Sequence, residues 1–177
     1  MKFNLDLPRY GSSFTKAFLF KPGYRFMVLY RYCNSYSSKS PIGFLIRIWY
    51  RNIQVKYGFQ IPHTCKIGIG LFMGHYGNII INQKSIIGDN CNIAQGVTIG
   101  NINKGSKKGS PTIGNEVWIG ANSVLVGKIT VGNNVLIAPL SYINFDVPDN
   151  AIIIGNPGKV VSYKGSGQYI NSKCILP

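Results

Sequence analysis

An aliphatic residue recurs at every sixth position over most of the C-terminal two thirds of the chain. An α-helix repeats at about 3.6 residues and a β-strand at about 2, so neither explains a step of six. The step suits a β-helix, in which each short strand points one aliphatic side chain inward and is followed by a corner. Glycine often follows the aliphatic residue, which we attribute to tight backbone conformations at the corners. The series comprises Ile61, Ile67 and Met73, then Ile81, Ile87, Ile93 and Ile99, and then Ile113, Ile119, Leu125, Val131, Ile137 and Ile143.

The step of six is interrupted twice, and each interruption adds two residues. Eight residues instead of six separate Met73 from Ile81, and fourteen instead of twelve separate Ile99 from Ile113. Extra residues leave a solenoid as a loop, and loops carry functional residues more often than core positions do. His75 lies in the first interruption. The second interruption contains the lysines Lys104, Lys107 and Lys108.

The N-terminal third lacks this step and is strongly basic. The chain has 19 Lys and Arg against 5 Asp and Glu, and no acidic residue lies between Asp6 and Asp89. Apolar residues at helical spacing before Ser38 and after Pro41 predict two helices, which would cap the open end of the solenoid. A basic and aromatic helix pair also suits an anionic membrane surface, so both roles stay open. No apolar run reaches the length of about eighteen residues that spans a membrane, and no motif for nucleic-acid recognition accompanies the charge.

These patterns divide the chain into three expected parts. They are a basic helical cap over residues 1–58, an all-β solenoid over residues 59–161 and a loose tail over residues 162–177. The four cysteines have no CxxC spacing, which favours free thiols in a reducing compartment. We therefore expect a cytoplasmic protein, with peripheral contact to the inner membrane left open.

Several stretches of the chain together resemble the hexapeptide acyltransferases. They are the six-residue series, residues 66–77 (KIGIGLFMGHYG), residues 87–100 (IGDNCNIAQGVTIG) and residues 155–161 (GNPGKVV). Within that family the chain is most similar to the serine acetyltransferases and the polysaccharide or capsule O-acetyltransferases related to them. The resemblance covers about residues 58–161. It implies a left-handed parallel β-helix, a homotrimer with active sites in clefts between subunits, and acetyl-CoA as the donor.

His75 is the candidate general base. Moving an acetyl group from a thioester to a hydroxyl needs a base for the hydroxyl proton, and neutral imidazole suits that role near pH 7. The resemblance implies the same role, because His75 matches the catalytic histidine of the family motif. His63 lies at a Pro-His corner, where we expect a structural role. The chain has two histidines, so we do not expect the three-histidine zinc site of the carbonic anhydrases that share this fold, nor any other metal.

The resemblance and the chemistry of CoA suggest the remaining contacts. The pantetheine arm would follow small residues at corners, and Lys159, which matches the basic residue of the family's closing motif, would meet a phosphate. Lys107 and Lys108 either close over a ligand or form a solvated loop. The candidate CoA-binding residues are Gly100, Gly120, Ala121, Ala138, Pro139 and Lys159, and the candidate acceptor-binding residues are Gln60, Tyr76, Lys107 and Lys108.

The chain departs from the serine-specific pattern at three positions. Serine acetyltransferases have Asp directly before the catalytic His, Asp fifteen residues upstream of it and a second His after the long loop; this chain has Gly74, Gln60 and Ser110 there. We therefore expect an O-acetyltransferase that acts on a sugar hydroxyl in capsule, O-antigen or exopolysaccharide synthesis by direct transfer, with His75 oriented by Gln60, a backbone carbonyl or water. Two alternatives stay open: a serine O-acetyltransferase, and a non-enzymatic trimeric scaffold that binds an anionic surface.

Overall fold

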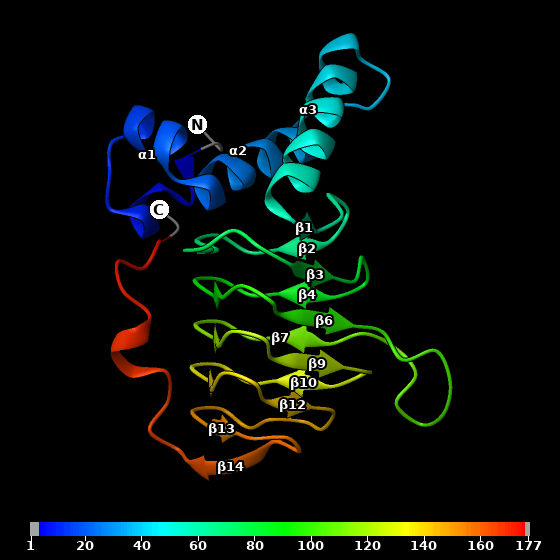
Figure 1. Ribbon diagram of the computed structural model, residues 1–177, viewed down its shortest axis with the longest axis vertical. Helices are drawn as coiled ribbons and strands as arrows, with labels where there is room; N and C mark the ends of the chain where they lie inside the picture. The colour runs from blue at the N-terminus through cyan, green and yellow to red at the C-terminus, as the bar shows by residue number, and fades with distance from the viewer. Residues whose placement is uncertain (1–3, 176–177) are drawn as a thin grey trace.

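The six-residue step appears as three sheets of very short strands, which form the sides of a left-handed β-helix (Figure 1). The computed structural model describes residues 4–175. All strand pairings are parallel except that of the last two strands, β13 and β14. Sheet A contains β1 (Phe59–Gln60), β3 (Ile79–Ile81), β6 (Thr98–Gly100), β9 (Val124–Val126) and β12 (Tyr142–Ile143). Sheet B contains β2 (Lys66–Ile67), β4 (Ile86–Ile87), β7 (Thr112–Ile113) and β10 (Thr130–Val131), and sheet C contains β5 (Asn92–Ile93), β8 (Trp118–Ile119), β11 (Leu136–Ile137), β13 (Ile152–Ile154) and β14 (Lys159–Ser162).

The aliphatic residues of the series form the core of the solenoid. All thirteen are buried, with at most 8 % of the residue surface exposed. Strand register places them directly above one another, as Ile81 pairs with Ile99, Ile99 with Leu125, and so on down sheet A. Burying one such side chain contributes about 1.5–3 kcal/mol, so the repeat supplies most of the stabilisation of the solenoid. The prediction of a parallel β-helix is confirmed.

The corner between sheets B and C shows why glycine follows the aliphatic residue. The Asn115 Oδ1 accepts a hydrogen bond from the Asp89 N–H at 2.8 Å, and the Asn133 Oδ1 accepts one from the Asn115 N–H at 2.8 Å. A Cβ on Gly88 would lie only 2.4 Å from that Asn115 oxygen. The left-handed backbone falls on the third corner residue, such as Asn90 with φ 57°. The left-handed conformation at this corner is therefore adopted by asparagine and not by the glycine, which instead leaves room for a ladder of polar side chains.

The cap contains four helical segments that the structure describes in full. The two predicted helices are present as α2 (Pro22–Ser35) and α3 (Pro41–Tyr57), whereas the sequence did not predict α1 (Phe14–Phe20) or the 3-10 helix η2 (Leu7–Tyr10). Phe26 of α2 packs on Phe59 at the end of the solenoid, with ring centroids 5.1 Å apart. No helix within residues 4–175 is apolar over a length that would cross a bilayer. Figure 1 shows α3 rising away from the solenoid.

The C-terminal segment runs back along the outside of the solenoid to the cap, so the prediction of a loose tail is wrong (Figure 1). The Asn90 side chain donates to the Cys174 carbonyl at 3.0 Å and accepts from the Cys174 N–H at 2.7 Å. Tyr169, at the end of the 3-10 helix η3 (Gly167–Tyr169), packs on Trp118 with ring centroids 4.9 Å apart. The tail has no repeat in its sequence because it makes one pass along the stack instead of joining it.

Candidate active site

The first interruption of the repeat forms a loop at the corner between sheets C and A. The loop runs from Phe72, which bridges to Asn92 of β5, to the start of β3. His75 and Tyr76 are both exposed in it. Within residues 4–175 the imidazole has no hydrogen bond, so neither Gln60 nor a backbone carbonyl orients it here. The structure thus places His75 where a ligand can reach it, as the sequence predicts.

The residues just before His75 are held from the N-terminal segment. The Tyr10 hydroxyl accepts a hydrogen bond from the Met73 N–H at 3.1 Å and donates one to the Leu71 carbonyl at 3.2 Å. Gly23 of α2 approaches the same backbone so closely that a Cβ there would lie 2.2 Å from the Met73 carbonyl oxygen. Sequence reasoning missed Tyr10, because no motif links residues so far apart in the chain.

A buried ion pair supports the same stretch of backbone. The Arg31 guanidinium lies 2.9 Å from the Asp6 carboxylate, whose side chain is only 1 % exposed. The carboxylate also accepts the Gly70 N–H at 2.7 Å, and Arg31 donates to the Ile67 carbonyl at 3.0 Å. Both charges are therefore paired and hydrogen-bonded, which a buried ion pair requires. Together with Tyr10, this network fixes the chain that leads into the His75 loop.

The corner that carries His75 also carries most of the residues predicted to contact CoA. Successive coils stack there, and the Leu140 N–H donates to the Ala121 carbonyl at 2.9 Å. Lys159 is exposed at the start of β14, opposite Ile154, at the far end of this corner. Small side chains keep the corner narrow. The small residues on it are Gly120 and Ala121 after β8 and Ala138 and Pro139 after β11.

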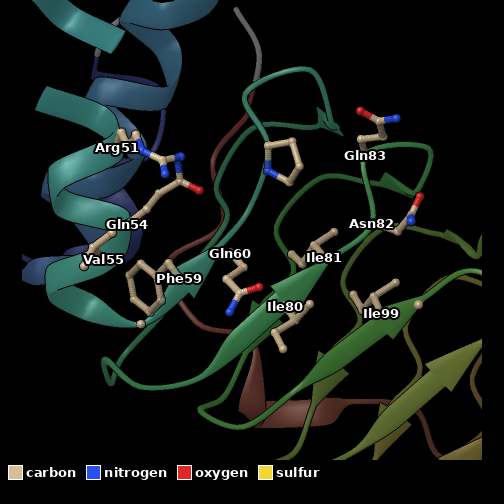
Figure 2. Close-up of a pocket in the computed structure, with 13 residues that line it drawn as sticks. Arg51, Gln54, Val55, Phe59, Gln60, Ile80, Ile81, Asn82, Gln83 and Ile99 are labelled. Carbon is tan, nitrogen blue, oxygen red and sulfur yellow. The ribbon is translucent and has the colours of Figure 1, made fainter. Parts of the chain in front are cut away.

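Gly100 does not lie on this corner with the other candidate CoA residues. It ends β6 on the opposite side of sheet A and lines a cleft of about 770 Å³ between α3 and the outer surface of sheet A. Figure 2 shows the Arg51 and Gln54 side chains extending from α3 toward the segment that follows β1. The polar side chains that line this cleft are Arg51, Gln54, Gln60, Asn82 and Gln83.

The cleft has the chemistry of a site for a small polar anion or zwitterion. Arg51 is the single charged residue among its described lining, and within residues 4–175 its guanidinium has no hydrogen bond or ion pair. The four carboxamides around it each offer both donors and acceptors. Planar guanidinium groups pair well with carboxylates.

Gly58 connects the cleft to the His75 loop. Gly58 lines the cleft, and a Cβ on it would lie 3.2 Å from the carbonyl carbon of Gly77, two residues after His75. The Gly77 N–H donates to the Tyr57 carbonyl at 2.8 Å. On its other side Gly77 faces Gln95, at the same corner as the CoA candidates, where a Cβ would meet that side chain at 3.4 Å. The His75 loop therefore lies on this corner and, through Gly77, contacts the edge of the cleft at Gly58.

The second interruption forms a loop at the corner between sheets A and B. It is a small hairpin in which Ile102 and Gly109 pair. The Lys107 ammonium donates to the Asn144 carbonyl, and Lys108 is exposed. Ser110 reaches the cleft wall indirectly, since its hydroxyl lies 3.1 Å from the Oδ1 of Asn82. The structure thus links Ser110, and not the lysines, to the cleft.

His63 has different surroundings from His75. It is half-buried on the turn after β1, and burial together with the nearby Arg47 lowers its pKa. No group of three His, Cys, Asp or Glu side chains within residues 4–175 is arranged to hold a metal ion.

Comparisons with known proteins indicate the chemical class. A family model described as bacterial transferase hexapeptide (six repeats) matches residues 110–144. The serine acetyltransferase of Helicobacter pylori is 31 % identical over 144 residues, which are 81 % of this chain and 84 % of that protein. The serine acetyltransferase of Synechococcus elongatus is 33 % identical over 145 residues, 81 % of this chain and 59 % of that protein. The crystal structure of Neisseria gonorrhoeae serine acetyltransferase in complex with serine matches with a TM-score of 0.72 and 25 % identity over 90 % of this chain and 67 % of that chain. The chain spans about half the length of several curated relatives that it matches.

These similarities overturn the expected acceptor. The sequence predicts a sugar hydroxyl in capsule, O-antigen or exopolysaccharide synthesis, and that prediction is wrong, because these relatives and structural neighbours are serine acetyltransferases. The prediction rested on three missing residues, at positions 74, 60 and 110. It did not allow for a cation from outside the motif, and the structure places Arg51 of α3 in the cleft.

Proposed function

Because the chain belongs to the serine acetyltransferase family of hexapeptide-repeat acyltransferases, we propose that it transfers the acetyl group of acetyl-CoA to the hydroxyl of L-serine. The observation that supports this proposal is the place of the His75 loop, which lies on the corner of small residues and contacts the edge of the Arg51 cleft at Gly58. In the proposed reaction the donor lies on one side of the base and the acceptor on the other.

The donor would follow the corner between sheets C and A. Small residues leave the backbone accessible there, which suits the narrow pantetheine arm of CoA. Lys159, exposed at the far end of the corner, would meet a phosphate group of CoA as a point charge. The corner is on the surface of one copy of the chain, and a homotrimer with the corner facing a neighbouring copy is part of this proposal.

The acceptor would occupy the cleft. Serine carries a carboxylate and an ammonium group. The unpaired Arg51 guanidinium suits the carboxylate, and the carboxamide oxygen of Gln60 suits the ammonium group. This arrangement would take the place of the two aspartates and the second histidine that this chain lacks at positions 74, 60 and 110. The hydroxyl then points toward the edge of the cleft at Gly58, where the His75 loop begins to cover it.

His75 would act as the base in a direct transfer. The imidazole takes the serine hydroxyl proton as the oxygen attacks the thioester carbon, and the negative charge moves to the carbonyl oxygen. Collapse of this intermediate breaks the carbon–sulfur bond and leaves the acetyl group on oxygen. The departing CoA sulfur takes the proton back from the imidazolium. The products are O-acetylserine and CoA, and no acyl-enzyme forms.

The test is the release of CoA thiol by the purified chain with acetyl-CoA and L-serine. We expect release that depends on L-serine, with O-acetylserine identified by mass spectrometry, and no more than background hydrolysis with L-alanine, which lacks the hydroxyl. Release that is the same with and without L-serine would overturn the proposed acceptor.

A further inference from the structure

Helix α3 is apolar on both sides. Its inner side is buried against the rest of the protein through Tyr50, Ile53 and Tyr57. Its outer side exposes five large apolar residues, each between 44 % and 65 % exposed: Ile42, Phe44, Leu45, Ile48 and Trp49. A helix on the surface of a soluble domain normally has a polar outer side, and large exposed apolar patches mark interaction sites. The outer side of α3 therefore needs a partner that covers it.

Helix α1 extends this surface. Its C-terminal residues Leu19 and Phe20 are 55 % and 71 % exposed. The ring of Phe18 packs edge-on against Trp49 with centroids 6.2 Å apart, which joins α1 to α3. We call the five outer residues of α3, together with Leu19 and Phe20, the apolar face.

The positive charge around the apolar face is carried mainly by lysines. Arg25 and Arg47, on the helices of the cap, use their guanidinium groups inside it: Arg25 donates to the Phe18 carbonyl at 2.7 Å, and Arg47 donates to the Cys33 carbonyl at 3.0 Å. The lysines near the face are exposed on flexible side chains, and no acidic residue lies between Asp6 and Asp89. These exposed lysines are Lys16, Lys21, Lys39 and Lys56.

The charge decides between the two kinds of partner that would cover such a face. A second copy of the chain would bring like charges together, with no carboxylate nearby to compensate them. An anionic lipid surface supplies the opposite charge in its headgroups, which the lysine ammonium groups can reach. The aliphatic part of each lysine side chain then packs along the apolar surface. Trp at the boundary between apolar and charged groups is also typical of a membrane interface.

We propose that the apolar face binds the surface of an anionic lipid membrane, with α3 lying in the plane of the interface. Helices with an apolar side and flanking lysines bind membranes in this way. Figure 1 shows α3 at the end of the molecule opposite β14, where it rises away from the solenoid. This inference goes beyond the proposed acetyl transfer and does not depend on it.

The test is co-sedimentation of the full chain with phosphatidylcholine vesicles that contain or lack phosphatidylglycerol. We expect binding to the anionic vesicles only, weakened by salt and, in a Trp118→Phe background that leaves Trp49 as the single tryptophan, accompanied by a blue shift of the fluorescence. Leu45→Ser and Phe44→Ser are each expected to weaken binding about tenfold, and Lys16→Gln and Lys56→Gln about fivefold each.

The matched control is Val161→Ser. Val161 is 57 % exposed on β14, at the far end of the solenoid, and its substitution should leave vesicle binding unchanged. Absence of binding to anionic vesicles, or an equal loss in the control, would overturn the proposal. A second contradicting result would come from light scattering. If Leu45→Ser lowers the mass of the oligomer and leaves vesicle binding unchanged, the apolar face contacts a second copy of the chain and not a membrane. CoA release with L-serine is measured without vesicles, so failure of either proposal is separate from failure of the other.

Discussion

The two histidines of the chain lie at different corners of the first coil, and their surroundings show what an interruption of the repeat does. His63 sits half-buried on an ordinary turn, beside Arg47. His75 is exposed on the loop where the step of six is broken. Both are preceded by backbone that a buried tyrosine holds, since Tyr50 donates to the Ile61 carbonyl at 2.6 Å and Tyr10 bonds to Leu71 and Met73. The two sites therefore differ in where the backbone places the side chain, and only the loop at the interrupted corner exposes it next to the edge of the cleft at Gly58.

The largest expected loss of stability comes from removing the Asp6 carboxylate, which supports the backbone that leads into the His75 loop. Asp6→Ala leaves the Arg31 guanidinium largely buried without its partner, and loss of one member of a buried ion pair costs about 3–5 kcal/mol. Urea denaturation should show this loss in the free energy of unfolding. The control is Asp146→Ala, because Asp146 is exposed and accepts only the Thr130 N–H, a contribution of about 1 kcal/mol. Equal losses in the two variants would show that Asp6 has no special role.

Substitution of Tyr10 and of Tyr50 allows the surroundings of His75 and His63 to be compared directly. Tyr10→Phe and Tyr50→Phe each remove a buried hydroxyl, and each should lower the free energy of unfolding by about 1–3 kcal/mol. Tyr10 is expected to be a positioning residue, so Tyr10→Phe should also lower kcat for acetyl transfer with little change in the KM for acetyl-CoA. Tyr50→Phe should leave kcat unchanged. An equal change of kcat in both variants would mean that Tyr10 acts only through stability.

A smaller effect tests whether Arg51 binds L-serine in the proposed acceptor cleft. Arg51→Gln should raise the KM for L-serine about tenfold, since it removes a charge-assisted pair worth about 1.5–3 kcal/mol to the serine carboxylate. Lys56→Gln is the matched control on the same helix, because Lys56 does not line the cleft. Steady-state kinetics at saturating acetyl-CoA measures both. An unchanged KM in Arg51→Gln would remove Arg51 from the proposed site.

The smallest expected effect is the pH dependence of His63. Burial and Arg47 lower its pKa in the folded state, so the neutral form is favoured there. The stabilisation is present above the ordinary histidine pKa of about 6.5 and is lost as pH falls through that value and below it. Between about pH 7.5 and about pH 5, the Tm of the wild type should fall slightly more than that of His63→Asn. Identical decreases would show that His63 is not coupled to folding.

The solenoid could be predicted because its cause is local. Each inward position, such as Ile119 or Ile137, repeats the same requirement for a buried aliphatic side chain, and the step of six reports it along the sequence. The two helices α2 and α3 also follow from local periodicity. The C-terminal segment makes a single pass whose contacts, such as that of Cys174 with Asn90, leave no periodic trace.

The site could be predicted only in part, for the same reason. His75 is visible because it lies in a gap of the repeat. Tyr10 and Asp6 hydrogen-bond to the backbone just before that loop, although they are more than sixty residues away from it in the sequence. Arg51 lines the cleft because of the angle at which α3 packs against the end of the solenoid. Because these contacts depend on how the cap packs, the sequence alone led to the wrong acceptor.

The most direct test is a side-by-side measurement of CoA release by His75→Ala and His63→Ala with saturating L-serine, together with the Kd for acetyl-CoA. If His75 is the base, His75→Ala should lower kcat by about 10²–10⁴ with an unchanged Kd, because general base catalysis contributes that much. His63→Ala should stay within about twofold of the wild type, as expected for a substitution outside the site. Undiminished turnover in His75→Ala, or equal losses in both variants, would contradict the assignment of His75 as the base.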